Sequence, residues 1–362
     1  MKLYSARHHH CRTEEYLWRG HRLVVLENEL LRVAVVASKG ADIIEFRYKP
    51  RDLDVLWHAP QALLPPGETV GTAAASQGHF LDYYAGGWQE VLPNAGPATT
   101  YRGAELGLHG EVAMLPWDYR VLDDRPERVE LEFSVETRRT PFRLERRMAL
   151  ESGVPVISFE ERVTNLGEEE LAFAWGHHPA FGPPFLEAGC LIEMPPCSVV
   201  EPSYSKNLRR RFALERISTF PYMDNEAGEP ARVDEVLGKD ARTEDVVVFS
   251  GMNEGWYALR NPRLALAVGM VWDVKVFPYV WCWQVYGGSL GYPYYGREHI
   301  VALEPFNCPL LPLAECVDQR LAPVLAPAGH ISTRLEAGIY EAGSKIGRIG
   351  FGGKVHEFSV DL

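Results

Sequence analysis

The sequence predicts an all-β protein, a large antiparallel β-sandwich. Between Tyr119 and Asn165, apolar and polar residues alternate in short runs, and turn residues recur about every ten positions, a spacing typical of sandwiches and barrels. No segment keeps the helical period of apolar residues long enough for a crossover helix, which argues against alternating β and α units. With 362 residues, 46% of them hydrophobic, the chain can bury a large core. We expect one domain over residues 1–362.

Strands are expected along most of the chain, each marked by β-branched or alternating apolar residues. We expect them at residues 23–26, 31–37, 43–48, 52–57, 129–135, 142–150, 155–164, 245–250, 255–260, 264–272, 278–286 and 299–304, with a closing strand pair in 329–340. Residues 60–78 are rich in Pro, Gly, Ala and Thr without periodicity. A loop of that length is usually functional or disordered.

The charge balance and the cysteines limit the classes of partner. Lys and Arg number 37 against 49 Asp and Glu, a net charge of −12, which disfavours nucleic acid or an anionic membrane as partner. The first twelve residues have no apolar stretch typical of a secretory signal, and no run has the length of a membrane span. The six cysteines show no C-x-x-C pair and no metal-ligand spacing. We therefore expect reduced thiols in a cytoplasmic protein that could form a homodimer.

The segment from Ala174 to Gly182, Ala-Trp-Gly-His-His-Pro-Ala-Phe-Gly, ends a strand-like run with two histidines. Successive side chains of an extended chain point to opposite faces, so His177 falls on the face of the bulky residues. His178 falls on the face of alanine and glycine, where a ligand has room. Because Pro179 has no N–H to donate, we expect the strand to end there and to leave His178 at the edge of a cleft. The alternative is that both histidines are ordinary buried residues.

Two further segments carry side chains suited to a ligand. Residues 83–96 are dense in aromatic residues and glycines, and there Trp88 could stack on a sugar ring and Gln89 could bind it. A tight turn packed by Trp88 is the alternative. His109 and Glu111 lie two residues apart, hence on one face if extended, and could bind hydroxyl groups or a metal, or could simply be a polar pair at a sheet edge.

Taken in order, these segments resemble the galactose mutarotase-like superfamily, which contains the aldose 1-epimerases. The resemblance rests on residues 28–44 in the opening strands, on His109-Gly, on His178-Pro-Ala-Phe-Gly and on Leu303-Glu304-Pro, and it spans nearly the whole chain. The sequence departs from the family in two places. Gly86-Gly-Trp-Gln-Glu90 stands where the family has an Asn-Arg sugar-binding pair, and Ala180 stands where the mutarotases usually have Tyr. These departures indicate a divergent branch.

The resemblance implies an aldose 1-epimerase that interconverts the α and β anomers of a carbohydrate without a cofactor or metal. Ring opening needs a base for the C1 hydroxyl and an acid for the ring oxygen, which we expect on opposite sides of the sugar. The family's residues map on Glu304 as base and His178 as acid, with His178 charged or sharing a proton near neutral pH. The family's supporting histidine maps on His109 and its substrate-binding Asp on Asp245.

Other residues and other functions stay open at this point. Trp281 or Trp283 could supply stacking, and Arg297 is the best-placed cation if the sugar bears an acidic group. The protein could instead bind a small carbohydrate without turning it over. It could also be a metal-dependent sugar isomerase with ligands drawn from His109, Glu111, His177 or His178, and Glu304.

Overall fold

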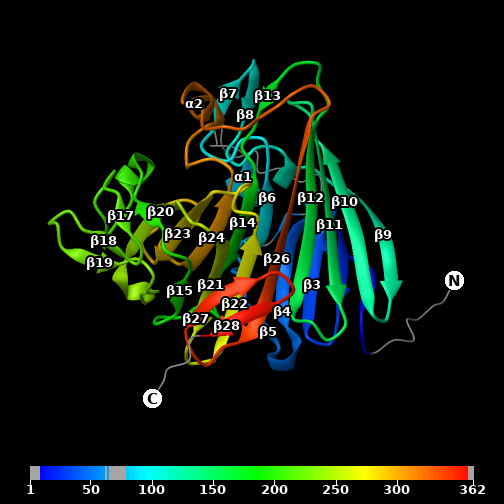
Figure 1. Cartoon of the computed structure of the whole chain (residues 1–362), viewed down its shortest axis with the longest axis horizontal. Helices are drawn as coiled ribbons and strands as arrows, with labels where there is room; N and C mark the ends of the chain where they lie inside the picture. The colour runs from blue at the N-terminus through cyan, green and yellow to red at the C-terminus, as the bar shows by residue number, and fades with distance from the viewer. Residues whose placement is uncertain (1–8, 62, 65–78, 358–362) are drawn as a thin grey trace.

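The computed structural model describes residues 9–61, 63–64 and 79–357, and within them two large antiparallel sheets form a sandwich (Figure 1). The predicted all-β sandwich is confirmed. The loop predicted at residues 60–78 lies almost entirely outside the described residues, and nothing in the structure tests it. Among the residues described, no helix combines the length and the apolar character needed to cross a membrane.

The larger sheet has twelve strands and carries the segments singled out from the sequence. Its order is β1-β2-β3-β4-β6-β14-β24-β23-β20-β16-β17, with β5 beside β4. The strands are β1 (Arg12–Trp18), β2 (His21–Glu27), β3 (Leu31–Val36), β4 (Asp42–Tyr48), β5 (Leu53–Asp54), β6 (Trp88–Val91), β14 (Gly176–Phe181), β16 (Ser198–Val200), β17 (Ser218–Thr219), β20 (Thr243–Ser250), β23 (Tyr279–Tyr286) and β24 (His299–Phe306).

The smaller sheet has eight strands in the order β15-β21-β22-β26-β12-β11-β10-β9. They are β9 (Asp118–Arg125), β10 (Arg128–Glu136), β11 (Phe142–Glu151), β12 (Val156–Asn165), β15 (Leu191–Glu193), β21 (Gly255–Asn261), β22 (Leu266–Trp272) and β26 (His330–Glu341).

Short elements surround the two sheets, and one pair of them, β27 with β28, packs against β21 and β22 of the smaller sheet. Four strand pairs are β7 (Thr99–Tyr101) with β8 (Ala104–Leu106), β13 (Leu171–Ala172) with β25 (Val324–Leu325), β18 (Tyr222–Asp224) with β19 (Pro230–Arg232), and β27 (Ile346–Gly350) with β28 (Lys354–Glu357). The helices are α1 (His79–Tyr83) and α2 (Leu313–Asp318), and the 3-10 turns are η1 (Lys49–Arg51), η2 (Val112–Met114), η3 (Ser203–Asn207) and η4 (Lys239–Ala241).

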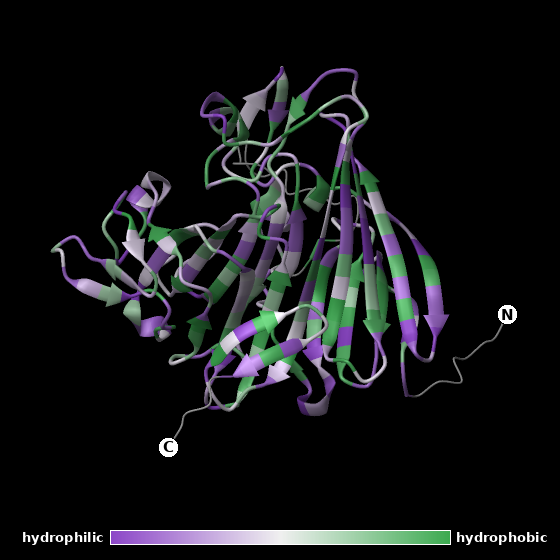
Figure 2. Ribbon diagram, viewed as in Figure 1, coloured by the Kyte–Doolittle hydropathy of each residue, from purple (hydrophilic) through white to green (hydrophobic). Residues whose placement is uncertain are grey.

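The core forms where the apolar faces of the two sheets meet. In β10, Val129, Leu131 and Phe133 are fully buried, whereas the polar residues between them point away from the core. Figure 2 shows the same alternation of hydrophobic and hydrophilic residues along the strands of the smaller sheet. This period of two, which was visible in the sequence, is the reason that the strands fall largely where they were expected.

Two strands of the larger sheet continue through a proline, and at one of these prolines, Pro179, we expected the strand to end. Strand β14 continues through Pro179 to Phe181, and β24 continues through Pro305 to Phe306. The ladder between β14 and β24 pairs Gly176 with Phe306 and then resumes only at Ala180 with Ala302. A proline has no N–H to donate, so the strand tolerates Pro179 at the cost of a gap in the ladder. The strand pair expected in 329–340 is also wrong, since one long strand, β26, occupies that segment.

Candidate active site

The candidate site lies on the outer face of the larger sheet, on neighbouring strands β14 and β24. His177 contacts Glu161 of β12 in the other sheet, so the next side chain, that of His178, points outward. Glu304 of β24 points the same way, and its Oε1 lies 3.5 Å from Nε2 of His178. The structure thus brings together the two residues that were predicted as acid and base, side by side on one face of the sheet.

Burial of the His178–Glu304 pair sets its protonation. Only 5% of His178 and 3% of Glu304 is exposed. Burial raises the pKa of Glu304 well above its ordinary value, because the carboxylate loses its hydration. Burial, with a smaller contribution from nearby His109, lowers the pKa of His178 well below its ordinary value. Of the two states expected for His178, the structure therefore favours a shared proton over a free imidazolium.

Aromatic rings from four segments of the chain surround this pair. The centroid of the Phe80 ring, in α1, lies 6.0 Å from that of His178, and Tyr84 lies at 5.4 Å with its ring edge-on. The Trp283 ring of β23 is 6.5 Å away. Because aromatic faces bind the C–H faces of sugars, these rings are suited to bind a carbohydrate. They also exclude water from the pair. The surrounding rings belong to Trp57, Phe80, Tyr84, Trp283 and Tyr294.

His109 completes the polar part of the site. Its ring centroid lies 4.9 Å from that of His178, and its Nδ1–H donates to the carbonyl of Ala95 at 2.6 Å. Burial lowers its pKa to about 4, so the ring is neutral at pH 7 and Nε2 remains a hydrogen-bond acceptor. Gly110 next to it has a φ of +68°, and a Cβ there would lie 2.4 Å from the carbonyl oxygen of Leu92. The His-Gly sequence is therefore required by the turn that delivers His109.

Asp245, expected to bind the substrate, and its neighbour Glu244 lie on opposite faces of the sheet. Asp245 points to the inner side of the sheet, where its carboxylate accepts hydrogen bonds from the backbone N–H and the Nε–H of Arg211, both at 2.6 Å. Glu244 lies on the outer face and accepts from Nε1–H of Trp283 at 3.1 Å. Because alternation along a strand reverses the face at each residue, Glu244 and not Asp245 lies on the same side of the sheet as the His178–Glu304 pair.

Of Trp88 and Gln89, only the glutamine lies next to the His178–Glu304 pair. The Trp88 ring packs on Phe159 in the core, with centroids 5.0 Å apart, and so is not placed to stack on a ligand of the outer face. Gln89 pairs with His178 across β6 and β14. Its Nε2 donates to Oδ2 of Asp42 at 3.2 Å and to the Gly86 carbonyl at 2.7 Å, and its buried Oε1 has no hydrogen-bond partner.

Arg297 does not face the site as a cation for an acidic sugar. Its side chain is exposed, and its Nε–H donates to the carbonyl of Tyr294 in its own loop at 3.3 Å. The same loop carries Glu298, which sequence reasoning missed. Glu298 accepts from Nε1–H of Trp57 at 2.9 Å, while its other oxygen is buried without a partner. Its sequence signal was weak, since it follows Arg297 in a loop without periodicity.

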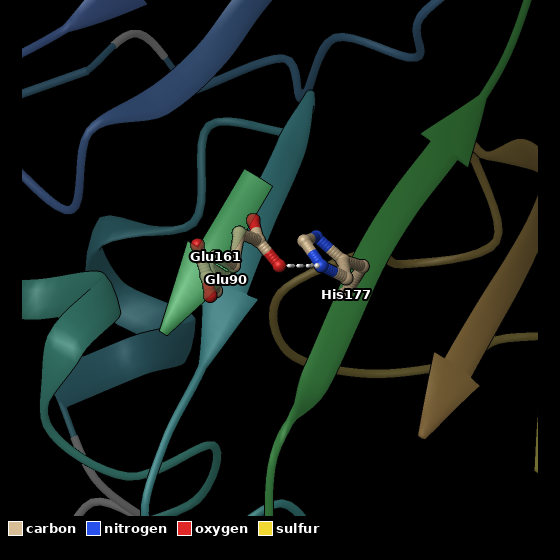
Figure 3. A group of neighbouring side chains, drawn as sticks. All are labelled: Glu90, Glu161 and His177. Carbon is tan, nitrogen blue, oxygen red and sulfur yellow. Dashed lines mark hydrogen bonds and ion pairs between the residues drawn. The ribbon is translucent and has the colours of Figure 1, made fainter. Parts of the chain in front are cut away.

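A second polar cluster lies on the opposite face of β14, in the core. Oε2 of Glu161 accepts from Nε2–H of His177 at 3.0 Å, and Glu90 approaches the same side chains (Figure 3). Nη1 of Arg146 lies 3.3 Å from Oε2 of Glu90. Burial raises the pKa of Glu90 to about 7 and that of Glu161 to about 8, and it lowers the pKa of His177 to about 4.

Among the described residues, these three side chains form the group close enough to hold a metal ion. The three side chains do not suit a metal ion. Trp88 donates its Nε1–H to Nδ1 of His177 at 3.2 Å, so the imidazole proton is on Nε2, the atom that would have to bind the metal. Arg146 also occupies the approach to Glu90. This cluster is a charge-balanced part of the core.

The ligand set considered for a metal-dependent isomerase does not converge either. Glu111 accepts hydrogen bonds from the backbone N–H groups of Arg138 and Arg139, both at 2.8 Å, and from the hydroxyl of Thr140 at 3.1 Å. It therefore holds the turn between β10 and β11 and does not join His109 in the site. His177, as shown above, belongs to the core.

Comparison with known proteins agrees with this architecture. Residues 18–339 match the model of a family described as a domain of unknown function, DUF4432. No curated protein matches the chain. Solved structures do match over nearly the whole chain.

A candidate aldose 1-epimerase from Klebsiella pneumoniae is 14% identical, with a TM-score of 0.71 over 91% of this chain and 84% of that one. A galactose mutarotase related enzyme from Lactobacillus acidophilus is 15% identical, with a TM-score of 0.60 over 91% and 98%. A galactose mutarotase-like protein from Clostridium acetobutylicum is 13% identical, with a TM-score of 0.57 over 92% and 99%. The chain therefore has the galactose mutarotase-like fold.

Proposed function

The chain belongs to the DUF4432 family, whose description names no activity, and we propose from its site that it is an aldose 1-epimerase-like enzyme acting on a sugar by acid–base ring opening. The observation that carries the proposal is the placement of His178 Nε2 and Glu304 Oε1, 3.5 Å apart and buried among aromatic rings. A fold shared with mutarotase-like proteins supports it but does not determine activity.

The side-by-side placement suits the reaction better than the opposite sides first expected. The C1 hydroxyl and the ring oxygen of an aldose are bonded to the same carbon, so the groups that exchange protons with them must also be neighbours. Glu304 as carboxylate takes the proton of the C1 hydroxyl, and protonated His178 gives one to the ring oxygen. The C1–ring oxygen bond breaks as the C1 carbonyl forms.

The reverse step on the other face of the carbonyl completes the interconversion. Rotation about the C1–C2 bond presents that face, the ring oxygen attacks C1, and both protons return to their starting groups. The two side chains together hold one proton throughout, which agrees with the shared proton inferred from their burial. General acid and general base each contribute roughly 10²–10⁴-fold to such a reaction.

The charges around the site support a sugar without a carboxylate or phosphate group. Glu244 and Glu298 are held by the indole N–H groups of Trp283 and Trp57, two of the rings that surround the His178–Glu304 pair. Arg297, the cation expected to meet an acidic sugar, instead supports its own loop. A neutral, unphosphorylated carbohydrate is therefore the proposed substrate.

A binding protein without catalysis is the second candidate, favoured by the closed state of the site. With so little of His178 and Glu304 exposed, a sugar could bind against Trp283 and Tyr294 without reaching either side chain. The two candidates differ in one measurable respect. Only the enzyme accelerates the interconversion of anomers.

The deciding experiment follows freshly dissolved pure anomers by polarimetry and NMR, over neutral aldoses, uronic acids and sugar phosphates. Acceleration of one sugar that survives a chelator and disappears in Glu304→Gln would support the epimerase. Saturation transfer from the protein to a sugar whose anomers relax at the uncatalysed rate would support the binding protein and overturn the enzyme.

A further inference from the structure

We propose that Tyr84 is a positioning residue for His178, holding Nδ1 of the imidazole so that Nε2 faces Glu304 and the sugar. This inference rests on the proposed function and assigns a role to a residue outside the predicted site. Its basis is the contact between the Tyr84 hydroxyl and His178 Nδ1, 3.3 Å apart.

The position of the Tyr84 hydroxyl is determined by the packing of its ring. Tyr84 follows α1 and is 1% exposed. Its ring stacks on that of Phe80 with centroids 4.9 Å apart and an interplanar angle of 26°, and the Trp57 ring lies 5.4 Å away on a tilt. The ring meets His178 edge-on, at 88°. A side chain held by three other rings places its hydroxyl within a narrow range.

Proton delivery from Nε2 requires an acceptor at Nδ1. When protonated His178 gives its Nε2 proton to the ring oxygen of the sugar, the neutral imidazole that remains carries its proton on Nδ1. A buried N–H without a partner would disfavour that product. The oxygen of Tyr84 accepts this N–H, and so His178 keeps one orientation before and after the transfer.

A phenol suits this role better than a carboxylate would. Burial raises the pKa of Tyr84 well above its ordinary value, so the hydroxyl remains neutral at any working pH. A carboxylate at the same place would stabilise the imidazolium and make His178 a weaker acid. The neutral oxygen orients the ring and alters its acidity less than a carboxylate would.

The test compares Tyr84→Phe with Tyr286→Phe, a matched control. Tyr286 is also fully buried, and its hydroxyl has no hydrogen-bond partner. In ¹⁵N-labelled protein, His178 is assigned from the signals that His178→Asn removes. We expect the Nδ1–H tautomer in the wild-type protein and in Tyr286→Phe, and a shift toward Nε2–H in Tyr84→Phe. An Nε2–H tautomer in the wild type, or no change in Tyr84→Phe, would overturn the proposal.

The kinetic arm separates this inference from the proposed function. Loss of an orienting partner costs about 10- to 100-fold in activity, so Tyr84→Phe should lower kcat by that factor with little change in KM, while Tyr286→Phe keeps wild-type kcat. Equal kcat in Tyr84→Phe and wild type would overturn the positioning role with the epimerase intact. A wild type without activity toward any sugar would overturn both roles, even where the tautomer shows the Tyr84–His178 hydrogen bond.

Discussion

His177 and His178 are consecutive residues, yet they belong to two different chemical environments. Both are buried and both have lowered pKa values, so burial and pKa do not distinguish them. Their partners do. Both nitrogens of His177 are engaged in hydrogen bonds, of 3.2 Å to Trp88 and 3.0 Å to Glu161. His178 is held at Nδ1 by Tyr84, and its Nε2 lies 3.5 Å from Glu304, a longer contact that a ligand can replace.

Of the two histidines, the one proposed to take part in the reaction is the one whose set of close partners is incomplete. In the core, Arg146 balances the charge of Glu90, and the cluster is closed. On the outer face, burial alone raises the pKa of Glu304, without a cation to balance the charge of its carboxylate. The interior cluster serves the fold, and the outer pair retains a proton that can be moved.

The largest expected effect comes from making the same Glu→Gln substitution on the two faces of the sheet, at Glu304 and at Glu161. Glu304→Gln should lower the rate of anomer interconversion by roughly 10²–10⁴-fold, with an unchanged melting temperature, because the amide resembles the protonated acid. Glu161→Gln should keep full activity. The assignment of the inner cluster to the fold and of the outer pair to activity would be contradicted if Glu161→Gln were the inactive variant or if Glu304→Gln failed to fold. His178→Asn should behave as Glu304→Gln does.

The second prediction concerns how the free energy of unfolding depends on pH. The pKa of Glu161 is about 8 and that of Glu90 about 7 in the fold, against 4.5 ordinarily. Groups with raised pKa values stabilise the fold while protonated, so their contribution is complete below about pH 4.5 and is lost as the pH rises to 8. Unfolded His177 still releases its proton over about the first pH unit above its ordinary pKa of 6.5 and opposes this loss there. Beyond that, the free energy of unfolding should fall by on the order of 1 kcal/mol per pH unit for each group still protonated in the fold.

Urea unfolding at pH 6.5 and pH 8.5 measures this slope. Glu161→Gln should show a smaller loss than the wild type over the same range, because one titrating group is gone. An identical slope in the two proteins would show that Glu161 is already ionised in the folded core, contrary to its burial.

A third prediction tests access to the two histidines. Phe80 contacts His178 and His109 but lies on the outer face, away from His177. Phe80→Ala should therefore speed the modification of His178 by diethyl pyrocarbonate several-fold. The extent of modification is measured by mass spectrometry of the digested protein. His177 should stay unmodified in both proteins. Equal labelling of the two histidines in the variant would mean that the core had opened and that the faces are not independent.

The smallest expected effect concerns the charge of the sugar. A uronic acid should react about 10-fold more slowly than the corresponding neutral aldose, because the acidic residues Glu244 and Glu298 contact two of the aromatic rings proposed to bind the sugar, Trp283 and Trp57. Glu244→Gln should narrow this difference, and Asp245→Asn, changed at the adjacent but inward-facing residue, should not. A uronic acid that reacts faster than the neutral sugar would refute the assignment of the substrate.

Much of the fold and part of the site could be predicted from the sequence. Alternation alone placed His177 and His178 on opposite faces, since that inference needs only local extended geometry. It could not decide between Glu244 and Asp245, because the pattern shows which residues share a face and not which face looks outward. The same ambiguity misplaced Trp88, whose direction depends on the pairing of β6 with β14.

Contacts between distant segments lay beyond the sequence pattern. Tyr84 stood in an aromatic-rich stretch, but its contact with His178 joins residues 94 positions apart. Pro179 misled the prediction for a related reason. A proline is excluded from the ladder only on the side where its N–H would donate, and that side follows from the neighbouring strands.

The gap at Pro179 leaves two adjacent strands of the larger sheet without ladder pairing over a short interval. Between Gly176–Phe306 and Ala180–Ala302, β14 and β24 are not joined as ladder partners, and His178 and Glu304 lie within that interval. A molecule that separates these two side chains would meet no pairing of β14 with β24 between those two positions. In this interval the two strands can separate with less loss of backbone pairing than along the continuous ladder between β23 and β24.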